Sequence, residues 1–129
     1  TWTVANTPIR SLSSGGISAL AFRDPRHGIA VGSDFAPGAA SVDTLALTND
    51  GGATWQLNPD TPVGLRSGAH WVTGRDVIIV GEGGSDVSTD QGRTWRQFDE
   101  GSFDTVDCAG GFACWAAGAQ GRVAFLTRD

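Results

Sequence analysis

Ser88-Thr89-Asp90-Gln91-Gly92-Arg93-Thr94-Trp95 repeats the pattern of an earlier stretch, Thr48-Asn49-Asp50-Gly51-Gly52-Ala53-Thr54-Trp55. Both read S/T-x-D-x-G-x-T-W. The carboxylate can accept hydrogen bonds from turn amides, and the glycine can take a positive φ, so the first five positions suit a hairpin turn. The threonine and tryptophan then begin the return strand. The sequence therefore predicts two equivalent strand–turn–strand units.

Partial copies of this pattern lie at both ends of the sequence. Thr1-Trp2 matches its last two positions, and Thr127-Arg128-Asp129 matches its first three. Trp2, Trp55 and Trp95 therefore mark successive repeats of roughly 40 residues or more, the period of a propeller blade of about four strands. Helical repeats of this period need long amphipathic segments, which the sequence lacks. We expect an all-β fold of β-propeller blades, each of four antiparallel strands, with about three blades in this chain.

The repeats divide a single propeller segment, residues 1–129, into four parts. Residues 1–5 are expected to form the outer strand of a preceding or closing blade. Residues 17–57 and 66–98 each supply one blade, and residues 103–129 supply a blade that lacks its last strand. The aliphatic run over residues 77–80 does not alternate with polar residues, which predicts a strand buried on both faces.

Composition excludes several classes of function. The chain has 129 residues with a formal charge of −5, and all 9 of its basic residues are arginine. No basic stripe is present, which argues against a nucleic-acid surface. The longest aliphatic run, residues 77–80, is far too short to span a bilayer.

The order of the repeat elements resembles a known family of propellers. The stretch Ala21-Phe22-x4-His27-Gly28-x-Ala30-Val31-Gly32 leads into the first hairpin pattern, and similar stretches end at Gly84 and Gly118. The hairpin pattern resembles the Asp box, or BNR repeat, of sialidase-like β-propellers. The whole layout is similar to exported proteins related to the photosystem II stability and assembly factor. The resemblance implies a non-catalytic scaffold for protein binding or assembly, without a cofactor.

The resemblance also gives the repeated box positions a structural role. The carboxylates hold the hairpins, and the tryptophans pack between blades instead of stacking on sugars. These residues are Thr48, Asp50, Gly52, Thr54, Trp55, Ser88, Asp90, Gly92, Thr94 and Trp95.

A glycan-binding or glycoside-hydrolysing Asp-box propeller, of which this chain would be a fragment, is the alternative. A glycosidase needs two positioned carboxylates. Glu82 with Asp86 and Asp104 with Asp107 are candidate pairs, but a chain with 14 acidic residues gives such pairs by chance. A sialidase is contradicted because that family relies on a tyrosine nucleophile and this chain has no tyrosine. We predict no catalytic residue.

Metal sites find little support in the sequence. The run Asp86-x-Ser88-x-Asp90-x-Gly92 is similar to a calcium loop, but its glycine comes one position late and Gln97 replaces the final glutamate. His27 and His70 lack the spacing of zinc ligands.

Arginines are the candidate contacts for a partner. Arg66 and Arg75 bracket a predicted inner strand, so we expect them near the central channel, where they would contact an anionic protein partner. Arg93 and Arg96 flank the second hairpin pattern and are expected outside. A lone chain would expose blade faces and strand edges, which predicts self-association or the remaining blades of a longer chain.

The two cysteines lie on either side of a predicted turn centred on Gly111. Cys108 and Cys114 would then face each other across a hairpin, where opposed Cα atoms are about 4.5 Å apart and within reach of a disulfide. Together with the resemblance to exported proteins, this pairing predicts a disulfide and an extracytoplasmic location.

Overall fold

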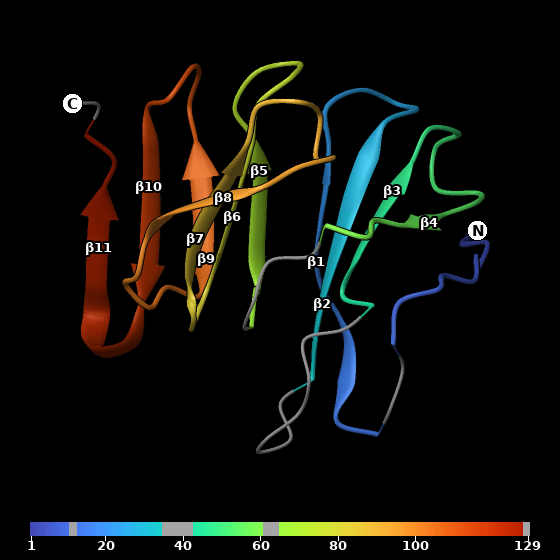
Figure 1. Cartoon of the computed structure of the whole chain (residues 1–129), viewed down its shortest axis with the longest axis horizontal. Helices are drawn as coiled ribbons and strands as arrows, with labels where there is room; N and C mark the ends of the chain where they lie inside the picture. Colours follow the sequence, from blue (N-terminus) through green and yellow to red (C-terminus); the bar gives the residue numbers. More distant parts are fainter. Residues whose placement is uncertain (11–12, 35–42, 61–64, 128–129) are drawn as a thin grey trace.

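The computed structural model describes residues 1–10, 13–34, 43–60 and 65–127, which form three antiparallel sheets side by side (Figure 1). We call these sheets the first, second and third blades. This arrangement confirms the predicted all-β fold of propeller blades. The first blade contains β1 (Gly15–Phe22), β2 (Gly28–Asp34), β3 (Leu45–Thr48) and β4 (Gln56–Leu57). The second contains β5 (Gly68–Trp71), β6 (Val77–Gly81), β7 (Gly84–Ser88) and β8 (Arg96–Asp99). The third contains β9 (Thr105–Cys108), β10 (Cys114–Gly118) and β11 (Arg122–Phe125).

Each sheet follows the order of the chain, so every strand pairs with its successor. The first strands of the blades, β1, β5 and β9, are neighbours and form the inner row. β4 and β8 are the outer strands of their sheets. The turns after β1 and β5 lie at the same end of the blades as the two hairpins after β3 and β7. We call this end the box face, the hairpin Thr48–Trp55 the first box, and the hairpin Ser88–Trp95 the second box.

The core lies between the blades, and β6 contributes to both halves of it. Val77 and Ile79 pack against a cluster from the first blade that includes Ile29, Val31 and Leu45. The alternate residues Ile78 and Val80 pack in the other direction, with Val106 and Cys114 of the third blade. The prediction that the 77–80 run is buried on both faces is therefore confirmed.

A glycine lies at or near the end of the second strand of every blade: Gly32 lies near the end of β2, and Gly81 and Gly118 are the last residues of β6 and β10. The segment that leads into the inner strand crosses each of them. A Cβ at Gly81 would collide with the carbonyl oxygen of Leu65, and one at Gly118 would lie 3.1 Å from the Ser102 oxygen. At Gly32 it would lie 2.7 Å from Cγ2 of Ile9. These glycines provide the space for the linker between blades.

The structure departs from the sequence predictions at both ends of the repeat series. Residues 1–8 lie in no strand, and Trp2 and Val4 are 98% and 90% exposed. The strand predicted over residues 1–5 is therefore not formed among the described residues, where this segment joins none of the three sheets.

In the third blade, the expected start of a box at Thr127 is out of register. Trp115 pairs with Phe125, whereas the corresponding pair in the second blade is Ile78 with Val87. The turn Ala119–Gly121 is one residue longer than its counterpart, so Leu126 takes the place of Ser88. Residues 128–129 lie outside the described part of the chain.

Candidate functional site

The two boxes have the same hydrogen-bond pattern. In the first box, Thr48 Oγ1 donates to Asp50 Oδ1 at 2.9 Å and accepts from the Gly52 N–H at 3.0 Å. The backbone N–H and the hydroxyl of Thr54 donate to the two oxygens of Asp50 at 2.9 and 2.5 Å. The Trp55 indole then donates to the Gly52 carbonyl at 3.0 Å.

The second box repeats every one of these bonds. Ser88 Oγ donates to Asp90 Oδ1 at 2.7 Å, and Thr94 donates twice to Asp90 at 2.9 and 2.6 Å. The Trp95 indole donates to the Gly92 carbonyl at 3.0 Å. The hydroxyl, carboxylate and indole side chains identified by the sequence pattern therefore form hydrogen bonds within their own hairpin.

Hydrogen bonding keeps the box carboxylates ionised. Donation from the Thr54 side chain, the Thr54 N–H and the Thr48 hydroxyl lowers the pKa of Asp50 to about 2. Burial acts to raise the pKa of Asp90, but bonds from Thr94 and Ser88 outweigh it and lower that pKa to about 2. A carboxyl with so low a pKa has no proton to donate near neutral pH, so neither group suits a general acid.

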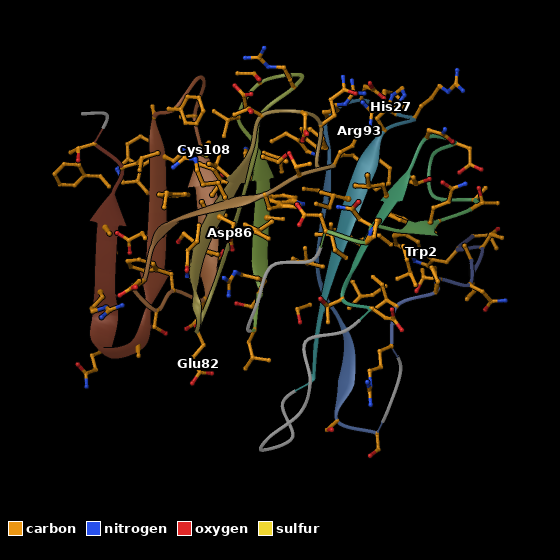
Figure 2. The ribbon with its side chains drawn as sticks, viewed as in Figure 1. Trp2, His27, Glu82, Asp86, Arg93 and Cys108 are labelled. Carbon is orange, nitrogen blue, oxygen red and sulfur yellow. A yellow bond between two sulfur atoms is a disulfide. The ribbon has the colours of Figure 1, made fainter. Side chains whose placement is uncertain are left out.

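The boxes are tied to the turns that follow the inner strands. The Gly51 N–H donates to the Arg26 carbonyl at 2.9 Å, and the Gln91 N–H donates to the Arg75 carbonyl at the same distance. Each blade thus presents two adjacent loops on the box face. Figure 2 shows His27 and Arg93 close together at this end, with Glu82 at the opposite end.

A cleft of about 210 Å³ opens on the box face between the first and second blades. Two arginines and a histidine line it, and none of its lining residues is acidic, although the chain as a whole carries a net charge of −5. The lining residues are Arg23, His27, Gly28, Leu47, Thr48, Asn49, Thr54, Gln56, Trp71, Gln91 and Arg93.

Asp24 orients the turn on one side of the cleft. Its Oδ1 accepts the N–H groups of Arg26 and His27, each at 2.8 Å, and lies 2.9 Å from His27 Nδ1. Arg23 Nη1 donates to Oδ2 at 3.2 Å. The Arg26 N–H contributes most to lowering the pKa of Asp24 to about 2, and burial opposes the shift. The turn therefore holds His27 and Arg23 in place with a fixed negative charge.

An indole forms part of the cleft wall beside Arg23. The Arg23 guanidinium lies 5.6 Å from the centre of the Trp71 ring, within the range of a cation–π contact. The Trp71 indole donates to the Ala21 carbonyl at 3.0 Å, which links the second blade to the first. Arg23 Nε is buried and makes no hydrogen bond among the described residues. Arg93 is exposed on the second box.

The two arginines predicted as partner contacts have different environments. Arg66 is buried, and its Nε donates to Asp86 Oδ2 at 2.6 Å, with side-chain exposures of 4% and 5%. This burial corrects the expectation that Arg66 reaches a partner, because the charge is already paired inside the second blade. Arg75 is 70% exposed, and its Nε lies 3.2 Å from Asp76 Oδ1.

The acidic residues considered for hydrolysis lie in different environments. Asp86 is buried against Arg66, while Glu82 is exposed at the turn between β6 and β7, and Figure 2 shows the two well apart. Asp104 and Asp107 are both exposed. His70 Nδ1 lies 3.6 Å from Asp107 Oδ1. Over the described ranges, no group of three or more histidine, cysteine or acidic side chains could hold a metal ion.

Cys108 and Cys114 form the predicted disulfide. The two residues are direct partners in the pairing of β9 with β10, and their Cα atoms are 4.1 Å apart. Gly110 and Gly111 take positive φ values of 126° and 54° in the turn between them. Cys114 also belongs to the core cluster between the second and third blades.

Sequence reasoning did not find the cleft. It rejected His27 as a zinc ligand and expected Arg93 outside, yet both residues line one cavity. The repeat itself contained a usable signal. In each blade the turn after the inner strand comes before the box, and two adjacent blades place the box of one beside the turn of the other.

Comparison with known proteins supports the fold assignment. No family model matches the chain, and no curated protein matches it. Among solved structures, the chain is similar to one described as "YCF48 bound to D1 peptide", with a TM-score of 0.64 and 23% sequence identity. The match covers 92% of this chain and 42% of that chain. This chain thus spans less than half the length of that structure, and the likeness identifies its three sheets as blades of a β-propeller.

Proposed function

We propose that this chain is a segment of a non-catalytic β-propeller that binds an extended protein segment in the cleft between the first and second blades. The observation that carries this proposal is the chemistry of the cleft wall. Arg93 and Arg23 supply positive charge; Arg23 is paired with Asp24 outside the cleft lining, and no lining residue is acidic. A guanidinium can bind a carboxylate through two parallel hydrogen bonds, and the amides of Asn49, Gln56 and Gln91 can pair with a peptide backbone.

The structural neighbour adds support for a peptide ligand, since its description names a bound D1 peptide. For this chain, we propose the partner only from the chemistry of the cleft. It is a protein segment with an acidic side chain or a carboxyl terminus, next to an apolar residue that packs on Trp71. We also propose that the two boxes are Asp boxes of the sialidase-like type, with Asp50 and Asp90 in a purely structural role. Their saturated hydrogen bonding supports this assignment.

Selection from a displayed peptide library against the immobilised chain tests the proposal. We expect the selected peptides to be rich in Asp and Glu, and Arg93→Glu to weaken their binding at least tenfold by calorimetry. Arg96→Glu is the matched control, because Arg96 is also an exposed arginine beside the second box but does not line this cleft. Equal affinities for the wild type and Arg93→Glu would contradict the proposal.

An enzymatic assay distinguishes the glycan-processing alternative from the binding proposal. We expect no turnover of aryl glycosides or polysaccharides by the chain. Hydrolysis that is abolished by changing Asp104 or Asp107 would replace the binding proposal with an enzymatic one.

We further propose an extracytoplasmic location. The disulfide supports it, because such bonds persist in oxidising compartments and are rare where thiols are kept reduced. In the described part of the chain, no helix is both long and apolar enough to cross a membrane. Thiol titration of the unfolded, unreduced protein from its native host should find no free thiol, and two reactive thiols would remove the support.

A further inference from the structure

Hydrogen bonds beside the cleft cross from the first blade to the second box. The side-chain amide of Asn58, which directly follows β4, donates to the Gly92 carbonyl at 2.9 Å and to the Arg93 carbonyl at 3.0 Å. Two residues further on, Asp60 Oδ2 accepts the Trp95 N–H at 2.9 Å. These bonds join residues 34 or 35 positions apart, so they connect two different repeats. We call them the outer tie.

The first blade holds Asn58 through its backbone. The Asn58 N–H donates to the Leu45 carbonyl at 2.9 Å, which extends the pairing of β3 with β4. Gln56, two residues earlier on β4, lines the cleft. The chain therefore runs directly from the cleft wall to the outer tie, and the amide of Asn58 has a fixed position relative to the first blade.

A second contact joins the two blades on the inner side of the same cleft. The Trp71 indole on β5 donates to the Ala21 carbonyl on β1 at 3.0 Å, and Trp71 lines the cleft. Because β1 and β5 belong to the inner row and β4 is an outer strand, the cleft lies between an inner and an outer attachment. Its two walls are held at a set separation before any ligand binds, which lowers the entropic cost of binding.

We propose that Asn58 is a positioning residue for Arg93, an inference that rests on the proposed binding of an acidic protein segment in this cleft. Arg93 is exposed on the cleft wall that the second box forms. Its own carbonyl is one of the acceptors of the Asn58 amide, so this bond fixes the backbone from which the guanidinium extends. A guanidinium binds a carboxylate through two parallel hydrogen bonds, which need a defined orientation. Asn58 itself is not among the lining residues and acts through Arg93.

A double-mutant cycle with a defined peptide tests this role. The probe is a fluorescein-labelled synthetic peptide in which aspartate alternates with leucine, and fluorescence anisotropy measures its affinity. Asn58→Leu removes the amide donor at a similar side-chain volume, and we expect it to weaken binding about fivefold in the otherwise unchanged chain. In the Arg93→Gln background, which lacks the guanidinium, the same change should weaken binding less than about twofold.

Ser67→Ala is the matched control. The Ser67 hydroxyl donates to the Asp104 carbonyl at 2.9 Å, so this change removes a similar side-chain bond between the segments that lead into β5 and β9. Ser67 does not line the cleft, and we expect its loss to leave the affinity unchanged. Urea denaturation checks that every variant is folded.

The outcomes separate this inference from the proposed function. Equal weakening by Asn58→Leu in both backgrounds, or equal weakening by Ser67→Ala, would indicate a general loss of stability and overturn the positioning role. Binding that Arg93→Gln weakens but Asn58→Leu leaves unchanged would overturn the positioning role and retain the proposed function. A wild-type chain that does not bind the peptide would overturn both.

Discussion

Equivalent positions in the first and second blades are occupied by side chains of different polarity and charge. In the second blade, the linker residue Arg66 is buried against Asp86. In the first blade, the linker residue Ile9 packs with Ala46, which occupies the position of Asp86 in the strand pairing. The same backbone arrangement therefore accepts either an apolar contact or an ion pair. The ion pair is stable only as a unit, because either charge alone would remain buried without its partner.

Arg66→Met tests this coupling. We expect a loss of about 3–5 kcal/mol in the free energy of unfolding, because Asp86 would keep a buried, unpaired charge. Arg66→Ile combined with Asp86→Ala should recover most of the loss, since it reproduces the contact of the first blade. Urea denaturation measures both variants, and a double variant as unstable as the single one would contradict the argument.

Asp90→Asn tests the structural role of the boxes. The change removes a charged acceptor of three hydrogen bonds, so we expect a loss of about 1 kcal/mol after allowance for solvent screening. Asp104→Asn is the control, because its side chain is exposed and makes no hydrogen bond within the described residues. Equal stability of the two variants in urea would show that the box carboxylate is dispensable.

The pH dependence of stability should follow the same carboxylates. The folded-state pKa values of Asp24, Asp50 and Asp90 are about 2, below the ordinary value of 3.8. A group with a depressed folded pKa contributes stability above its unfolded pKa and loses it as pH falls through the folded one. We therefore expect the free energy of unfolding to fall between about pH 4 and pH 2, and to fall less steeply in Asp90→Asn. A wild-type profile that is flat over this interval would contradict the assigned hydrogen bonds.

At the scale of the elements, the glycine at or near the end of each second strand leaves room for the linker that leads into the same blade. Gly81→Ala would force its Cβ into the Leu65 carbonyl, so we expect a loss of about 3 kcal/mol from overpacking. Gly74→Ala is the matched control, because nothing lies within 4 Å of its Cβ position and its φ is not positive. Its stability in thermal unfolding should stay within about 0.5 kcal/mol of the wild type. A tolerated Gly81→Ala would mean that the linker can shift without cost.

The elements of the blades could be predicted because local signals mark them. Glycines and box residues give the turns, and the aliphatic run over residues 77–80 identifies the doubly buried β6. Residues 1–5, predicted as an outer strand of a preceding or closing blade, lie in no strand here, because a local sequence signal does not supply the neighbouring strand that such pairing needs. The burial of Arg66 was missed for a similar reason, since its partner Asp86 lies 20 residues away across a linker. The cleft depends on two blades meeting and has no local signal.

At the scale of the described residues as a whole, the second blade lies between the first and the third and has a sheet on each side. All residues of β6 and β7 are buried, whereas Val123 and Phe125 of β11 are each 70% exposed. Opening free energies vary across a structure with burial and contact density. We expect amide exchange to be slowest in residues 77–81 and at least a hundredfold faster in residues 122–125. Equal protection in both strands, measured by mass spectrometry, would indicate that the three blades unfold as a single unit.

The compactness of each box also bears on the order of folding. Every hydrogen bond to its carboxylate joins residues no more than four positions apart. Contacts between such close neighbours form early, because little chain entropy is lost in closing so short a loop. The chain reversals of the first two blades can therefore exist before any inner strand has found its neighbour. Each reversal would then act as a seed from which its sheet grows inward, toward the row formed by β1, β5 and β9.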